Sequence, residues 1–219
     1  MLYQLHEMQR SLLSPLMQWA EASSKLFTNP VSPLAHTPFS QRIAAGYELM
    51  YRLGKDYEKP AFGIKEVEVN GKQVPIIERV VDNKPFCKLL HFGKDLSEKE
   101  IKALKHPTVL IVAPLSGHHA TLLRDTVHAM LHEHDVYITD WVDARQVPLS
   151  EGPFHLNDYV KYVQEFIRHL GPDVHVISVC QPTVPVLAAI SLMATNKDPM
   201  LPKTMTMMGG PIDPRKSPT

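Results

Sequence analysis

The chain has little of several features that assign a protein to a class at once. Only two of its 219 residues are cysteines, Cys87 and Cys180, whereas a secreted domain held by a disulfide framework needs more. Its 23 basic residues equal its 23 acidic residues, so it lacks the positive charge of a nucleic-acid-binding protein. No apolar run approaches the roughly 20 residues of a membrane span, and the N-terminus does not have the form of a signal peptide. These absences predict a cytoplasmic protein with free thiols, no nucleic-acid partner and no membrane span.

Sequence motifs for metals and cofactors are also missing. His128 and His132 are one helical turn apart, but Ala129 stands where a zinc protease has its glutamate, so we predict no metal site. Gly209-Gly210-Pro211 fits neither a phosphate-binding loop nor a dinucleotide fingerprint. We interpret it as a turn and predict no cofactor.

Residues 1–58 are predicted to form a helical segment. Apolar residues recur every three to four positions from Leu2 to Trp19, which is typical of one helix face. Serine caps helices and proline favours their first position, so Ser14-Pro15 predicts two helices that meet at Ser14. A further helix is predicted from Thr37-Pro38 to Gly54, after a proline-rich loop that we expect to be extended.

Residues 59–219 have the pattern of a core of strands and helices. Asn70-Gly71 separates two strand-like runs and predicts a β-hairpin. After a third strand near 86–92, apolar runs at 109–115, 136–139, 174–179 and 204–208 alternate with amphipathic helical stretches. This alternation predicts a mostly parallel sheet with helices on both faces and right-handed crossovers.

Cys180 falls where the strand at 174–179 ends and a helix is about to begin. A sharp strand-to-helix turn of this kind, a nucleophile elbow, lifts a side chain above the sheet edge. The first N–H groups of the helix then favour a thiolate and stabilise an oxyanion. We therefore predict that Cys180 is a nucleophile in an α/β-hydrolase fold. Cysteines in other settings are more often small buried residues, which is our interpretation of Cys87.

A second loop, 114–119, follows the strand that starts at residue 109, where this fold places its other oxyanion donor. The backbone N–H of Gln181 and that of Leu115 or Ser116 are predicted to form the oxyanion hole. His118 and His119 are candidates for contact with the substrate. Adjacent residues point in different directions, so we expect at most one of them to make that contact.

Several blocks of the sequence, taken in order, resemble the intracellular polyhydroxybutyrate depolymerases: MLYQLHEMQR, AAGYELMYRLGKDYEKPAFGI, APLSGHH, TDWVDAR and SVCQP. The resemblance spans the whole chain. It implies hydrolysis of ester bonds in amorphous poly(3-hydroxybutyrate), with release of 3-hydroxybutyrate oligomers and monomers through an acyl-enzyme on the cysteine. The expected partner is then the surface of cytoplasmic polyester granules. The N-terminal helices either touch that surface or pack on their own domain.

The elbow departs from the G-x-S-x-G form of related hydrolases, because Ser178 and Pro182 occupy its glycine positions. Serine is a small replacement for glycine, and proline is tolerated in the first turn of a helix. Polyester synthases also use an elbow cysteine on this fold, and TDWVDAR is similar to theirs, but their elbow keeps its glycines. A synthase-like acyltransferase is therefore the second hypothesis, and a non-catalytic granule-associated protein is the third.

A general base is missing after Cys180. The triad of this fold runs nucleophile, acid, histidine, yet the last histidine of the sequence is His175. Asp213 lies where some hydrolases place the acid, although PIDPR predicts a turn. We therefore expect a hydrolase core that is incomplete at its C-terminus, with the acid and histidine beyond Thr219 and an open sheet edge at 204–208. Residues 1–219 alone should lack turnover.

Overall fold

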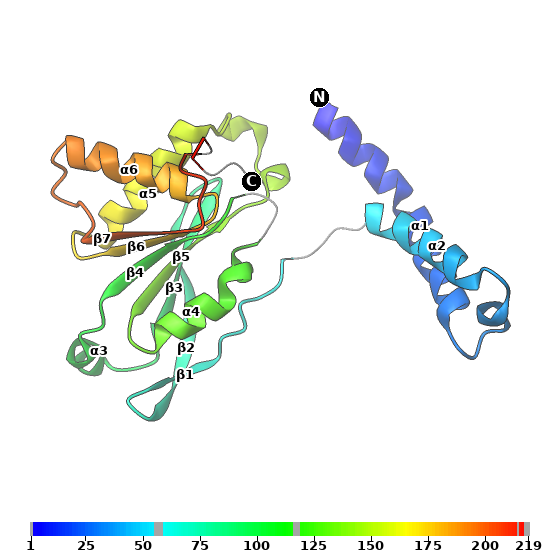
Figure 1. The fold of residues 1–219 in the computed structure, drawn as a ribbon, viewed down its shortest axis with the longest axis horizontal. Helices are drawn as coiled ribbons and strands as arrows, with labels where there is room; N and C mark the ends of the chain where they lie inside the picture. Colours follow the sequence, from blue (N-terminus) through cyan, green and yellow to red (C-terminus); the bar gives the residue numbers. More distant parts are fainter. Residues whose placement is uncertain (1, 55–58, 116–118, 214, 217–219) are drawn as a thin grey trace. The chain divides into compact units, whose positions relative to one another are not determined.

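The computed structural model describes residues 2–54, 59–115, 119–213 and 215–216. The chain divides into two compact units, Met1–Lys59 and Pro60–Thr219 (Figure 1). The first unit is helical, and the second contains all seven strands of the sheet.

The helical unit consists of α1 (Leu2–Thr28), the short 3-10 helix η1 (Pro33–His36) and α2 (Ser40–Gly54). Small residues let α1 and α2 approach each other, since Ala20 and Ala44 are both buried and the Ser24 hydroxyl donates to the Ala44 carbonyl at 3.2 Å. Trp19 packs edge-on against Tyr47, with ring centroids 5.3 Å apart. None of the helices that the structure describes is both long enough and apolar enough to cross a bilayer.

Two expectations for this unit are wrong. Pro15 lies inside α1, so Ser14 does not separate two helices. A proline removes one backbone hydrogen bond from a helix, and the turns on either side keep theirs over the 27 residues of α1. The loop after α1 is not extended throughout, because Ser32 accepts a hydrogen bond from the Leu34 N–H and caps η1.

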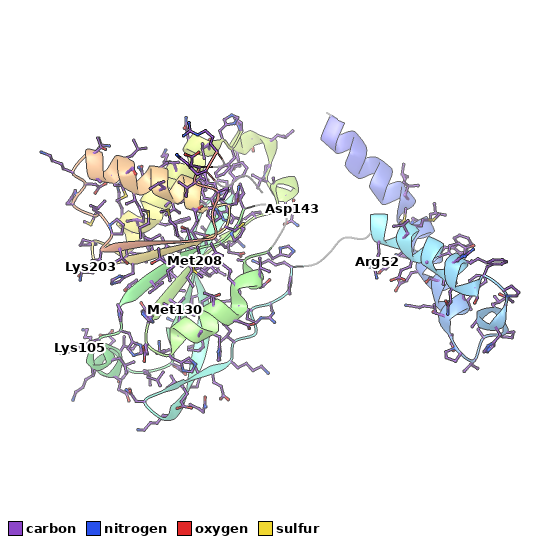
Figure 2. The ribbon with its side chains drawn as sticks, viewed as in Figure 1. Arg52, Lys105, Met130, Asp143, Lys203 and Met208 are labelled. Carbon is purple, nitrogen blue, oxygen red and sulfur yellow. The ribbon has the colours of Figure 1, made fainter. Side chains whose placement is uncertain are left out.

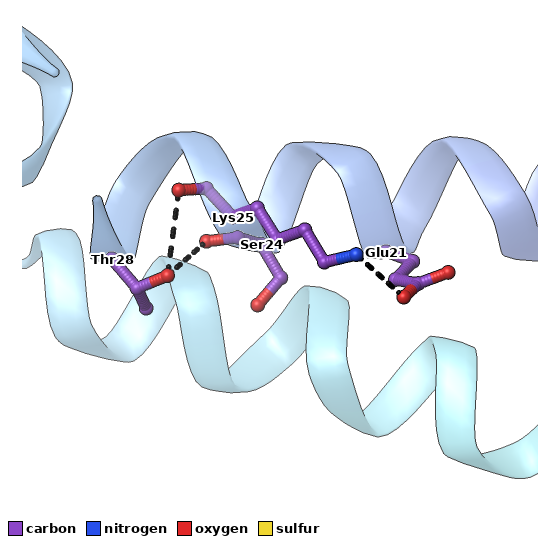
Figure 3. Close-up of polar contacts among 4 residues, drawn as sticks. All are labelled: Glu21, Ser24, Lys25 and Thr28. Atoms are coloured by element: carbon purple, nitrogen blue, oxygen red, sulfur yellow. Dashed lines mark hydrogen bonds and ion pairs between the residues drawn. The ribbon is translucent and has the colours of Figure 1, made fainter.

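Polar side chains support the last two turns of α1 (Figure 3). Lys25 Nζ lies 2.8 Å from Glu21 Oε1, one turn earlier in the helix. The Thr28 hydroxyl donates to the Ser24 carbonyl at 3.1 Å, which gives a partner to a carbonyl near the helix C-terminus. Both contacts are local and do not depend on other parts of the chain.

The second unit is built on one sheet with the strand order β1-β2-β3-β5-β4-β6-β7. Asn70 and Gly71 both have positive φ, 51° and 78°, and form the predicted hairpin turn between β1 and β2. Strands β1, β2 and β3 pair antiparallel, β3 pairs antiparallel with β5, and β5, β4, β6 and β7 are parallel. The strands are β1 (Glu66–Val69), β2 (Lys72–Asn83), β3 (Cys87–Lys94), β4 (Thr108–Val112), β5 (Asp135–Trp141), β6 (His175–Val179) and β7 (Thr204–Met208).

Helices cover both faces of this sheet (Figure 1). The side chains of α4 pack with one face of β4 and β5 in a first apolar core, and those of α5 and α6 pack with the opposite face in a second. The helices of this unit are α3 (Glu98–Leu104), η2 (Ala120–Leu123), α4 (Arg124–Leu131), η3 (Ala144–Gln146), η4 (Leu149–Glu151), α5 (Leu156–Leu170) and α6 (Thr183–Thr195).

The strand order confirms the predicted α/β-hydrolase fold. In the parallel part, the chain crosses from β4 to β5, returns past β4 to β6 and continues to β7, so the carboxyl ends of β4 and β6 are neighbours. Each of these ends leads into a loop that precedes a helix, the arrangement that carries the nucleophile and its oxyanion donors. Among the described residues β7 is the last strand of the sheet.

Candidate active site

The turn between β6 and α6 has the geometry of a nucleophile elbow. Cys180 follows the last residue of β6 and has φ of 67°, a left-handed conformation that costs a residue with a side chain about 1–2 kcal/mol. Its side chain is exposed to solvent. A strained backbone persists only where its surroundings hold it, so the contacts of this turn decide how the cysteine is presented.

Backbone hydrogen bonds hold Cys180 from both sides. Its N–H donates to the Met208 carbonyl at 2.8 Å. Met208, labelled in Figure 2, is the last residue of β7. Its own carbonyl accepts two hydrogen bonds from Thr183, one from the N–H at 3.2 Å and one from the hydroxyl at 2.8 Å. The turn is therefore fixed to the neighbouring strand and to the first residue of α6.

The chain just after β7 packs directly against this turn. A Cβ atom on Gly210 would lie 1.7 Å from Thr183 Oγ1, far inside any permitted contact. Gly209 has φ of 59°, which supports the interpretation of Gly209-Gly210-Pro211 as a turn. Gly210 is thus required because the backbone approaches the buried Thr183 side chain closely.

The two residues that replace the elbow glycines fit their positions. Ser178 is fully buried, and its hydroxyl donates to the Thr206 carbonyl on β7 at 3.3 Å, so this buried hydroxyl has a partner. Pro182 immediately precedes α6, where its missing N–H is tolerated. Its carbonyl accepts the Val186 N–H at 3.0 Å.

The structure brings together two of the predicted oxyanion residues. The Leu115 backbone N–H donates to the side-chain oxygen of Gln181, Oε1, at 3.0 Å. Among the described residues, none accepts a hydrogen bond from the Gln181 backbone N–H. Ser116 and His118 lie outside the described residues. His119 is partly buried and caps the N-terminus of η2 without a side-chain hydrogen bond.

Three buried side chains that the sequence analysis did not single out fix the start of the Leu115 loop. The Ala113 N–H donates to Thr139 Oγ1 at 2.9 Å. The Ala113 carbonyl accepts hydrogen bonds from Trp141 Nε1 at 2.9 Å and from the Tyr159 hydroxyl at 3.4 Å. With both of its backbone groups held, Ala113 fixes the position of Leu115 two residues later.

Burial also keeps Tyr159 in its donating form. The ring is 3% exposed and packs edge-on against Trp141, with centroids 4.4 Å apart. Removal from water raises the pKa of Tyr159 far above its usual value, since the phenolate is the form that burial disfavours. The hydroxyl therefore stays protonated and donates to Ala113.

The histidine pair that could have indicated a metal site has other contacts. The His128 and His132 rings meet edge-on, with centroids 5.5 Å apart, and His132 Nδ1 lies 2.9 Å from the Glu68 carbonyl. Within the described parts of the chain, no group of three or more histidine, cysteine, aspartate or glutamate side chains is arranged to hold a metal.

No general base is assigned to Cys180 in this structure. No histidine of the described segments makes a hydrogen bond with the thiol. His175 begins β6, at the opposite end of the strand from the elbow, and its Nδ1 contacts Thr204 Oγ1 at 2.8 Å. The Asp213 carboxylate accepts hydrogen bonds from the Arg215 N–H and guanidinium, which lowers the pKa of Asp213. This local pairing agrees with the loop interpretation of PIDPR.

Comparisons with known proteins add little to this geometry. No family model matches the chain, and no curated protein matches it in sequence. Among solved structures it is similar to MGS-M1, an alpha/beta hydrolase enzyme from a Medee basin deep-sea metagenome library, with 14% identity and a TM-score of 0.26. The match covers 50% of this chain and 47% of MGS-M1, so the chain spans about half the length of that protein. The fold assignment rests on the strand order.

Proposed function

We propose that the chain carries the nucleophile and the oxyanion site of an ester hydrolase that attacks its substrate with a cysteine thiol (a thiol hydrolase). The observation that carries this proposal is the backbone of Cys180, which is left-handed, exposed and held between the end of β6 and the start of α6. A buried structural cysteine needs no such conformation, and Cys87, with no exposed surface, has none. Strain that the surrounding hydrogen bonds maintain is typical of a functional position.

The proposed reaction begins with attack of the Cys180 thiolate on the carbonyl carbon of an ester. The carbonyl electron pair moves onto oxygen, and the resulting oxyanion accepts hydrogen bonds from the backbone N–H groups of Gln181 and Leu115. When the tetrahedral intermediate collapses, the carbon–oxygen bond to the alcohol breaks, and the leaving alkoxide takes a proton from solvent water, which reaches the exposed site. The product is a thioester on Cys180, which water hydrolyses in a second step.

The proposed substrate is poly(3-hydroxybutyrate), and the support for it is the resemblance of five ordered sequence blocks to the intracellular depolymerases. Three of these blocks contain parts of the described site, since APLSGHH includes Leu115, TDWVDAR includes Trp141 and SVCQP includes Cys180 and Gln181. A neutral polyester also suits a chain with balanced charge. We place the protein at cytoplasmic polyester granules on the same basis, with His119 as a candidate for contact with the polymer.

Acylation tests this function directly. Residues 1–219 are incubated with a 3-hydroxybutyryl ester and analysed by intact mass and peptide mapping. The expected result is one acyl group on Cys180, no adduct on Cys87, and no adduct on the Cys180→Ala variant. An unmodified Cys180 in folded protein would refute the thiol hydrolase.

Turnover separates the remaining hypotheses. Because no histidine follows Cys180 in the sequence, we expect residues 1–219 to release no 3-hydroxybutyrate from amorphous granules after the first acylation. Sustained release would contradict this expectation about the base. Polymer formation from a 3-hydroxybutyryl coenzyme A thioester would indicate a synthase, and binding to granules without acylation would indicate a granule-associated protein.

A further inference from the structure

The oxyanion site described above already contains an acceptor. The Leu115 N–H donates at 3.0 Å to Gln181 Oε1, a residue 66 positions later in the chain. An amide oxygen and an ester carbonyl oxygen are chemically similar acceptors. Both require the same direction of approach to the N–H, so the side chain of Gln181 and a substrate carbonyl compete for it.

The groups on the two sides of this hydrogen bond differ in how firmly their neighbours hold them. Leu115 follows Ala113, whose N–H and carbonyl are held by Thr139, Trp141 and Tyr159. Gln181 is exposed, and its side chain ends in solvent when it rotates away. The donor is therefore fixed, and the acceptor can leave without disturbing a packed core.

We propose that Gln181 is a specificity-determining residue whose side-chain amide occupies the oxyanion position in the free protein and is displaced by the oxyanion that forms from the substrate carbonyl during attack. This inference rests on the proposed thiol hydrolase. The backbone N–H of Gln181 donates to the oxyanion, while the Gln181 side chain restricts access to the second donor, the Leu115 N–H. Weak carbonyl ligands do not displace the amide, whereas an oxyanion that forms during attack makes a stronger, charge-assisted hydrogen bond and does.

The energetic consequence follows from the fraction of molecules in which the Leu115 N–H is open. An intramolecular hydrogen bond of ordinary strength closes the site in most molecules, and the apparent affinity for an acceptor falls by the open fraction. Removal of Oε1 should therefore accelerate acylation by about three- to tenfold. A carboxylate at the same place should hold the N–H more firmly and repel the developing oxyanion.

The experiment compares two reactions of the Cys180 thiol. Acylation by p-nitrophenyl butyrate is followed by its stoichiometric burst and depends on the oxyanion site. Alkylation by iodoacetamide forms no oxyanion and reports the reactivity of the thiol alone. The second-order rate constant for acylation, divided by that for alkylation, isolates the contribution of the oxyanion site. Thermal unfolding verifies that each variant is folded.

Three variants test the acceptor separately from the volume of the side chain. Gln181→Met keeps the length of the side chain but removes the amide oxygen, and Gln181→Ala removes the side chain. Both should raise the ratio about three- to tenfold, while Gln181→Glu should lower it by at least about tenfold. An unchanged or lower ratio in both Gln181→Met and Gln181→Ala would overturn the proposal and assign Gln181 to holding the loop. If the wild-type thiol is alkylated but never acylated, the thiol hydrolase itself is refuted, and this inference with it.

Discussion

Replacement of Gly210 by alanine is the sharpest test of how the nucleophile turn is held. The added Cβ would lie 1.7 Å from Oγ1, 2.4 Å from Cβ and 2.5 Å from Cγ2 of Thr183. Thr183 is completely buried, so its side chain cannot rotate into solvent, and the backbone of one segment has to move. Overpacking of this kind costs about 1–3 kcal/mol, and three contacts this short place Gly210→Ala at the upper end, about 3 kcal/mol.

The same change should weaken the proposed active site. Thr183 holds the Cys180 carbonyl through its N–H and its hydroxyl, so displacement of Thr183 releases the strained turn. We expect acylation of Cys180 to slow by about tenfold or more, equivalent to at least ~1.4 kcal/mol. The rate constant with p-nitrophenyl butyrate measures this loss.

Urea unfolding measures the cost in stability. The chain has two tryptophans, Trp19 and Trp141, so a Trp19→Phe background makes fluorescence report the sheet unit alone. Gly46→Ala is the control for an added alanine without a clash; it lies in α2 of the helical unit, so it is measured in the protein that keeps Trp19 as the reporter of that unit. Nothing lies within 4 Å of its added Cβ, and alanine is more favourable than glycine in a helix interior by about 0.5–1 kcal/mol. It should not lower stability.

A double-mutant cycle assigns the cost to the proposed contact. In a Thr183→Gly background all three short contacts of the added Cβ disappear, so Gly210→Ala should cost less than about 1 kcal/mol there. The reasoning is refuted if Gly210→Ala leaves the urea midpoint unchanged, or if its cost is the same in both backgrounds.

Three further predictions follow from the burial and the hydrogen bonds of single side chains. Iodoacetamide should label native protein on the exposed Cys180 and leave the fully buried Cys87 unmodified, and peptide mapping that finds equal labelling would contradict the structure. Burial lowers the pKa of His106 below its ordinary value of 6.5. Its neutral form therefore contributes stability above pH ~6.5, and this stability is lost as the pH falls through the folded-state pKa. His106→Gln should flatten the decline of the unfolding free energy between about pH 7.5 and 5.5, and an unchanged slope would refute this assignment. Trp141→Phe removes the indole donor from the Ala113 carbonyl and should cost about 1–2 kcal/mol in urea unfolding together with slower acylation; acylation at the wild-type rate would show that this hydrogen bond does not position the oxyanion loop.

The sequence was sufficient to predict the parts of this fold that depend on local pattern. The apolar runs and the helices between them predict the parallel strands, and Asn70-Gly71 predicts the hairpin because only a few residues adopt positive φ. Pro15 was misinterpreted, since the loss of one hydrogen bond does not end a helix whose other turns remain paired. The short helix η1 depends on a Ser32 cap within a segment whose prolines indicated extended chain.

The site was predictable only in part, for a physical reason. The position of Cys180 follows from adjacent strand and helix patterns, and so does the presence of a loop at Leu115. The contacts that fix them join distant residues, such as Ala113 with Thr139 and with Tyr159. A side chain that donates to a backbone carbonyl has no periodicity, so no sequence pattern reveals it.

The hydrogen bond from Cys180 to Met208 gives β7 a role beyond its contribution to the sheet. All five residues of β7 pair with β6, and paired strands open locally with a finite free energy. Each such opening removes the acceptor of the Cys180 N–H, and the left-handed turn loses one of the contacts that hold it. The geometry of the thiol and the local stability of the pairing between β6 and β7 are thus thermodynamically coupled.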